Sequence, residues 1–174
     1  MGKKQFYKKI LFASHNDDEA LFCAYTIMRE KPLVIVCFDS YVQDWTNWEE
    51  RRKESEQAVA ILGAEVDFLG LSDKDDTKDD LREAMQYYKA DKVWACTGSH
   101  KHHKWLGEVA RELWPECTLC STYEGDNFHV ETDWEIQPTL REMELKEMAL
   151  DCYKTQHEKN RSHFEKLKES EYYV

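Results

Sequence analysis

Long apolar segments, excess positive charge and flexible linkers are all missing from this 174-residue sequence. No apolar run approaches the ~20 residues that a membrane-spanning helix needs, so we expect no membrane span. Acidic residues outnumber basic ones by 35 to 24, and the resulting net charge of −11 argues against general nucleic-acid binding because it repels phosphate backbones. With 6 glycines and 3 prolines, no Gly/Ser/Pro-rich linker divides the chain. The sequence therefore predicts a single domain over residues 1–174 that includes a charged C-terminal tail at 157–174.

The N-terminus and the cysteines both indicate an intracellular protein. The first residues are basic but contain no apolar segment long enough for a secretory signal. Cys23, Cys37 and Cys96 lie inside apolar runs, which favours buried, reduced thiols. Cys117 and Cys120 form a single CxxC motif without a second pair, a weak signal for zinc. We expect a cytoplasmic location.

Short β-rich runs alternate with longer helical patterns along the chain. Strands are expected at residues 9–13, 33–38, 66–71, 92–97, 118–123 and 128–132. Helices are expected at 17–30, from a capping box at 46–49 to residue 62, and at 80–89, 104–114 and 139–153. This alternation predicts an α/β fold, a Rossmann-like three-layer sandwich. Its sheet is mostly parallel, in the order 3-2-1-4-5 with an added edge strand, and is flanked by helices. Such folds bind ligands beyond the carboxyl ends of adjacent strands where the connections change direction.

Two polar clusters follow the first and fourth expected strands, which this topology places side by side. They are SHNDDE at 14–19 and HKHH at 100–103, and together they hold four of the seven histidines. Two imidazoles and a carboxylate suit Zn²⁺, and three protein ligands leave a position open for water, as in catalytic zinc sites. Acidic residues also suit a helix N-terminus, and a lone His-x-x-His is common on solvated surfaces. Because both clusters occur at neighbouring strand ends, we favour a metal site.

These segments resemble the motifs of the PIG-L (LmbE-like) family of zinc-dependent N-acetylglucosamine deacetylases. SHNDDE resembles the (A/S)HPDDE signature of that family, and HKHHKWLG at 100–107 resembles its HPDHxxVG segment. Weaker similarities are RRKE at 51–54 with Ala58 and the LG pair at 62–63, LGLSD at 69–73, and Lys146 and Ala149 followed by YKTQ at 153–156. The similarity spans about residues 9–156. The sequence departs from the family pattern at Asn16, which replaces a proline, and at Lys101 and His102, which replace Pro-Asp.

The resemblance implies a deacetylase-like domain that hydrolyses a linear amide, removing the N-acetyl group from an N-acetylglucosamine-type amino-sugar conjugate. It implies that His15, Asp18 and His103 bind Zn²⁺, with another divalent metal such as Fe²⁺ as the alternative. The partner would be this small-molecule amino-sugar substrate. The oligomeric state stays open, a homo-oligomer included.

The resemblance also assigns catalytic and substrate-binding roles. Asp17 would be the general base that activates water, and a protonated His100 would stabilise the developing oxyanion. Arg51 is the candidate for contacting substrate hydroxyls or phosphate. Trp105 is a candidate for stacking on a sugar ring, although it can equally be a core residue.

Three other classes of protein fit parts of the sequence. A phospho-receiver signalling domain would use Asp73 as the acceptor and Thr97 after the fourth strand, but the chain offers no lysine after the fifth strand. That interpretation also leaves both histidine clusters unexplained. A dinucleotide-binding module is weaker, because the turn after the first strand contains no glycine. A non-catalytic metal-binding protein is the remaining alternative.

Overall fold

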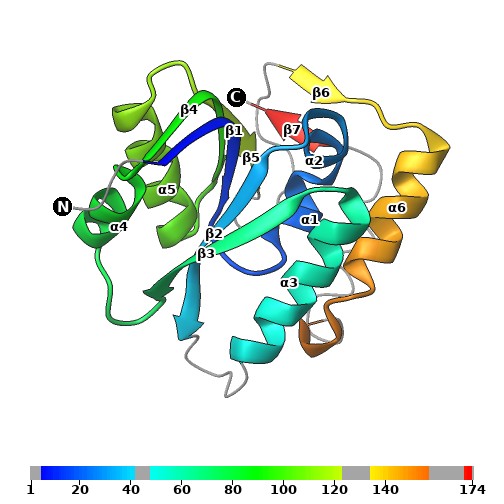
Figure 1. Cartoon of the computed structure of the whole chain (residues 1–174), viewed down its shortest axis with the longest axis horizontal. Helices are drawn as coiled ribbons and strands as arrows, with labels where there is room; N and C mark the ends of the chain where they lie inside the picture. Colours follow the sequence, from blue (N-terminus) through cyan, green and yellow to red (C-terminus); the bar gives the residue numbers. More distant parts are fainter. Residues whose placement is uncertain (1–4, 42–47, 123–133, 157–170, 174) are drawn as a thin grey trace.

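The computed structural model describes residues 5–41, 48–122, 134–156 and 171–173 (Figure 1). Within these ranges the strands are β1 (Gln5–Ala13), β2 (Leu33–Tyr41), β3 (Glu65–Ser72), β4 (Tyr88–Thr97), β5 (Thr118–Ser121), β6 (Trp134–Ile136) and β7 (Glu171–Tyr173). The helices are α1 (Asp18–Phe22), α2 (Ala24–Glu30), α3 (Trp48–Leu62), α4 (Lys78–Met85), α5 (Lys101–Leu113) and α6 (Leu140–Leu150). All the strands join one sheet.

The sheet has the order β3-β2-β1-β4-β5-β7-β6, which confirms the predicted order 3-2-1-4-5 and adds two strands at one edge. The first five strands pair in parallel, and β7 pairs antiparallel with both β5 and β6. Helices α4 and α5 pack together on one face, while α1, α2, α3 and α6 contact one another on the other (Figure 1). The expected three-layer α/β fold is therefore present.

The middle of the sheet explains why the apolar runs form strands. Residues Ile10 to Ala13 of β1 are completely buried, since helices cover both faces of this strand. Ile10 lies opposite Leu33 of β2 on one side and Val93 of β4 on the other. This pairing places the residues after β1 and after β4 at the same edge of the sheet.

The prediction of one continuous helix at 17–30 was wrong, because the segment forms two helices that are separated at Cys23. The backbone of Cys23 leaves the helical region, so a new helix, α2, begins after it. The first backbone amides of α2 have no partner within the helix. The buried Glu171 carboxylate accepts hydrogen bonds from two of these amides, those of Tyr25 (2.6 Å) and Thr26 (3.1 Å). A carboxylate at a helix N-terminus satisfies free donors and interacts favourably with the helix dipole, which accounts for the break.

Two further helix boundaries differ from the prediction. The helix expected at 80–89 ends at Met85, because Tyr88 already pairs with Gln5 at the start of the β1–β4 ladder. The helix expected from residue 104 begins at Lys101. The strand expected at 128–132 lies outside the described residues, as does Thr46 of the expected capping box.

The charged C-terminal tail expected at 157–174 ends in a strand with buried side chains, at residues 171–173. These residues form β7, and the side chains of Glu171 and Tyr173 are buried. The Glu171 carboxylate lies 3.6 Å from Nζ of Lys146 on α6 and accepts a hydrogen bond from the Tyr173 hydroxyl (2.7 Å). The charged character of the segment thus concealed a strand that belongs to the sheet.

Among the described residues, none of the helices has the length and apolar character needed to cross a membrane.

Candidate metal centre

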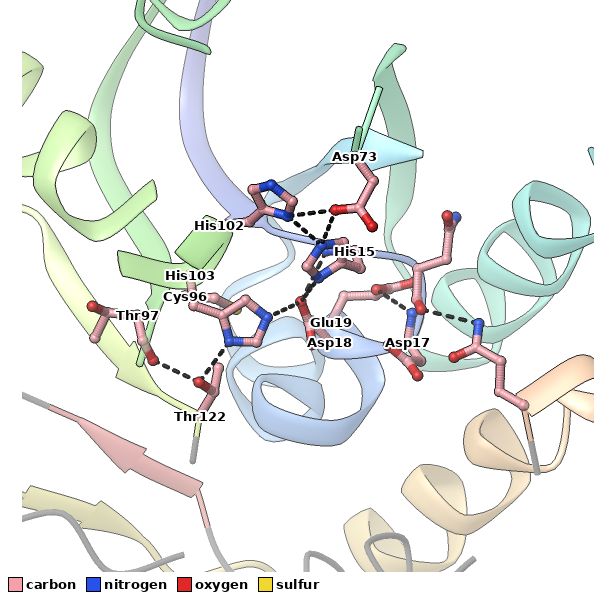
Figure 2. A network of polar contacts seen from close by, with 12 residues as sticks. His15, Asp17, Asp18, Glu19, Asp73, Cys96, Thr97, His102, His103 and Thr122 are labelled. Carbon is pink, nitrogen blue, oxygen red and sulfur yellow. Dashed lines mark hydrogen bonds and ion pairs between the residues drawn. The ribbon is translucent and has the colours of Figure 1, made fainter. Parts of the chain in front are cut away.

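Four histidine side chains meet where the loops after β1 and β4 come together, and Figure 2 shows three of them, His15, His102 and His103. The ring centroid of His15 lies 5.3 Å from that of His100, 5.3 Å from that of His102 and 5.4 Å from that of His103. His15 comes from the β1 loop, whereas the other three lie at or within the first turn of α5. The expected convergence of the two polar clusters is therefore present in the fold.

His15, Asp18 and His103 form one group of side chains that could hold a metal ion. Nε2 of His103 lies 3.0 Å from Oδ2 of Asp18, and Nδ1 of His15 lies 3.5 Å from the same oxygen. Asp18 is held in place by a hydrogen bond from the backbone amide of His15 (2.8 Å). Asp18 and His103 are buried, so a cation bound by them would be largely shielded from solvent.

Thr122 fixes the protonation of the His103 ring in the form that a metal ligand requires. Its hydroxyl donates to the carbonyl of Thr97 (2.8 Å), so the same oxygen is left to accept from Nδ1 of His103 (2.8 Å). With a proton on Nδ1, Nε2 is the atom of His103 that is left to bind a cation beside Asp18. The donor set and its supporting hydrogen bond fit a divalent metal such as zinc.

Asp17, which directly precedes the candidate ligand Asp18, occupies a strained backbone position. Its φ of 105° lies in a region that residues other than glycine rarely adopt, at a cost of about 1–3 kcal/mol. Its amide donates to Oε2 of Glu19 (3.1 Å), while its own carboxylate has no hydrogen-bond or ion-pair partner in the described part of the chain. Burial, together with the neighbouring Asp18 carboxylate, raises the pKa of Asp17 well above its usual value.

Asn16 shows what replaces the proline of the family pattern. Its side-chain amide donates to Oγ of Ser55 (2.9 Å), and its backbone carbonyl accepts from Arg51 (2.9 Å) and Gln156 (3.2 Å). These contacts tie the loop to α3 and to the segment that follows α6. The buried Arg51 therefore supports the backbone of the β1 loop, immediately beside Asp17.

The histidine rings have different electrostatic environments. Burial alone would lower the pKa of His15, but the Asp18 and Asp73 carboxylates raise it to about 9. Burial, and then repulsion from the other histidines, lowers the pKa of His100 to about 4. The protonated His100 implied by the resemblance stays a prediction, and the lowered pKa favours a neutral ring. It can still donate a hydrogen bond through one N–H group.

Trp105 lies on α5 next to this cluster. Its ring centroid is 5.4 Å from that of His102, and Nζ of Lys101 lies 4.3 Å from the centroid of the indole ring. The indole is partly buried and packs against the core. The indole therefore borders the histidine cluster, and the Lys101 ammonium group lies over one face of its ring.

Several residues that support the site could not be recognised from the sequence. Thr122 accepts a hydrogen bond from His103, and Ser55 accepts one from Asn16, although both residues are distant from their partners in the chain. The only signal for Thr122 is its position directly after β5, the strand beside β4. Tyr153 was recognised only by its similarity to a closing motif, and its hydroxyl donates to Oε1 of Glu19 (2.5 Å).

Comparisons with known proteins give matches in structure alone. No family model matches the sequence, and a search of curated proteins finds no match. The zinc-inhibited form of the teicoplanin deacetylase Orf2 matches with a TM-score of 0.69 and 14% identity, over 96% of this chain and 97% of that chain. The hydratase GalB from Pseudomonas putida, which acts on 4-carboxy-2-hydroxymuconate, matches with a TM-score of 0.70 and 16% identity, over 96% of this chain and 95% of that chain.

A conserved protein from Thermus thermophilus also matches, with a TM-score of 0.68 and 19% identity, over 96% of this chain and 93% of that chain. This chain therefore shares its whole fold with these proteins, among them deacetylases. Because a hydratase has the same fold, the fold alone does not determine the reaction.

Proposed function

We propose that this protein is a metal-dependent hydrolase that removes an acetyl group from the nitrogen of an amino-sugar conjugate. The observation that carries the proposal is the group formed by His15, Asp18 and His103, directly beside the buried carboxylate of Asp17. The similarity of these residues to the deacetylase motifs supports it, as does the fold shared with the teicoplanin deacetylase. We treat residues 1–174 as one deacetylase-like domain of the PIG-L type.

His15, Asp18 and His103 would hold the metal, which we propose to be zinc. When bound, such an ion polarises a carbonyl group and makes water a stronger acid. Asp17 accepts the proton of the attacking water, because its carboxylate is adjacent to a ligand and engaged by no other group in the described part of the chain.

His100 donates an N–H group to the carbonyl oxygen as negative charge develops there. Asp17 then passes the proton that it took from water to the leaving amine. Trp105 offers an aromatic surface to the sugar ring beside the histidines. Arg51 contributes to substrate binding indirectly. It donates a hydrogen bond to the Asn16 carbonyl and thereby supports the β1 loop.

The proposed substrate is a small N-acetylglucosamine-type conjugate, and the proposed location is the cytoplasm. All six cysteines are free thiols, which suits a reducing compartment. Asp73, which a phospho-receiver would need as its acceptor, is already engaged by two imidazoles, so we do not favour that class.

The test is a mass-spectrometric screen of N-acetylated sugars for loss of an acetyl group, run beside a metal analysis of the same protein. We expect about one catalytic zinc per chain and product formation with at least one sugar. Asp17→Asn should keep the metal and lose turnover, and His103→Ala should lose most of the metal. Asp91→Asn is the matched control, because Asp91 is exposed and lies toward the opposite end of β4.

Two results would contradict the proposal. Full metal content in a His15→Ala/His103→Ala variant would refute the ligand assignment. A zinc-containing protein that is inactive on every acetylated sugar would refute the substrate class, and hydration of an unsaturated acid such as the GalB substrate would then be tested.

A further inference from the structure

A second set of metal-ligating atoms lies on the other side of the His15 ring (Figure 2). Nδ1 of His15 faces Asp18, as described above. Nε2 of the same ring lies 3.1 Å from Nδ1 of His102 and 3.3 Å from Oδ1 of Asp73. The His102 and Asp73 atoms are themselves 2.5 Å apart. One imidazole therefore offers a nitrogen to each of two donor sets.

The spacing of the second set suits a single ion. Ligand atoms at the usual zinc distances of ~2.0–2.2 Å, arranged tetrahedrally, lie about 3.3 Å from one another. Two of the three distances are close to this value, and the third needs only a small separation of His102 from Asp73. His15, His100 and His102 also form a group that could hold a metal, so we include His100 as a fourth ligand.

The position of His102 is fixed by its surroundings. The side chain is buried, and its ring stacks on Phe38 with the centroids 4.3 Å apart and an angle of 22° between the planes. Stacking keeps Nδ1 directed at Asp73 and at His15, so the site is built before an ion arrives. In the family pattern that the sequence resembles, an aspartate stands at this position. The change to histidine gives this chain an additional nitrogen ligand.

We propose that a second divalent cation binds between His102, Asp73 and His100, and that Nε2 of His15 completes its ligands. His15 then bridges two ions, with Nδ1 toward the first and Nε2 toward the second. Binding of the second ion displaces the remaining ring proton of His15 to solvent. The proposal shares His15 with the metal site of the proposed function, and His102 and Asp73 are its own.

The experiment is to remove all metal with a chelator, dialyse the protein to equilibrium against Zn²⁺, and measure bound zinc by mass spectrometry. We expect two equivalents in the wild-type protein and one in His102→Gln. Asp73→Asn should also bind one equivalent, and it decides the question if His102→Gln does not fold. Lys104→Gln, an exposed change on the same turn of α5, should retain two.

The other outcomes separate this inference from the proposed function. One equivalent in the wild-type protein overturns the second site and leaves the first intact. No bound zinc overturns both. Two equivalents in both His102→Gln and Asp73→Asn overturn the assignment of the ligands. With Co²⁺ in place of Zn²⁺, the visible absorption bands of the wild-type protein and of Lys104→Gln should change again on addition of the second equivalent. Those of His102→Gln and Asp73→Asn should not.

Discussion

The stability of this fold should depend strongly on the buried contact between Glu171 and Lys146. The Glu171 carboxylate accepts from the amides of Tyr25 and Thr26 and from the Tyr173 hydroxyl, and its charge faces the Lys146 ammonium group at 3.6 Å. Both charged side chains are fully buried. Replacing Glu171 by glutamine preserves the shape of the side chain but removes its negative charge. Among the described residues, Lys146 then has no ion-pair partner.

The expected cost can be taken from buried ion pairs in other proteins. Removing one partner of such a pair typically destabilises a protein by about 3–5 kcal/mol, because the other charge stays buried without compensation. In a chain of this length, each 1 kcal/mol lowers the melting temperature by about 2–4 °C. Glu171→Gln should therefore lower the melting temperature by about 6–20 °C.

The assay is urea-induced unfolding followed by tryptophan fluorescence. It should include Glu171→Gln, Lys146→Met, the double variant, and Glu135→Gln as an exposed control on β6. The double variant should lose less free energy of unfolding than the sum of the single variants, since neither charge is left alone. A loss below about 1 kcal/mol for Glu171→Gln, or strict additivity in the double variant, would refute the reasoning.

Three further predictions concern separate parts of the molecule. Hydrogen bonds from Arg29 lower the pKa of Glu142 to about 2, so Glu142→Gln should cost up to about 1 kcal/mol at pH 7. Because the native pKa lies below the unfolded value of about 4.3, this difference should fade as the pH drops from about 4.3 toward 2 in pH-dependent urea unfolding. A difference that stays constant over this range would disprove the electrostatic origin. Gly107→Ala would bring a methyl carbon into steric overlap with the side chain of Thr97 on β4, so the melting temperature should fall by an amount that corresponds to about 1–3 kcal/mol. An unchanged melting temperature would mean that α5 shifts freely. Thr122→Ala removes the acceptor of His103 and should weaken zinc binding by about 10–100-fold in a competition titration, whereas Thr122→Ser should bind zinc normally. Equal affinities for the two Thr122 variants would exclude this role.

The parallel half of the sheet could be predicted because its strands are continuous apolar runs. Residues such as Ile10 and Val34 are buried from both faces, and that environment leaves a clear pattern in the sequence. β7 could not be predicted in this way. It is three residues long, and its first residue is a glutamate whose burial depends on a lysine 25 positions earlier in the chain. A buried charge of this kind looks like a surface residue until its partner is known.

In the candidate site, too, some features could be predicted from the sequence and others could not. The convergence of the two polar clusters could be predicted, because strand order places the ends of β1 and β4 side by side. The choice of His15, Asp18 and His103 within these clusters came from the resemblance to the family motifs. The contacts of Thr122 and Asn16 could not be predicted, because each depends on the orientation of one hydroxyl or amide group. The lowered pKa of His100 depends on the burial of its ring and on the other imidazoles around it, and both become known only once the rings are in place.

The hydrogen bond between Glu171 and Tyr25 joins segments 146 positions apart in the chain. Contacts between such distant segments form slowly, because a long loop must close before they contribute any stability. We therefore expect β7 to enter the sheet late in folding, after the parallel strands have assembled. Until then the outer side of β5 is an unpaired edge that can pair with a strand of another chain. The folding intermediate without β7 is thus the state in which this protein is most prone to aggregate.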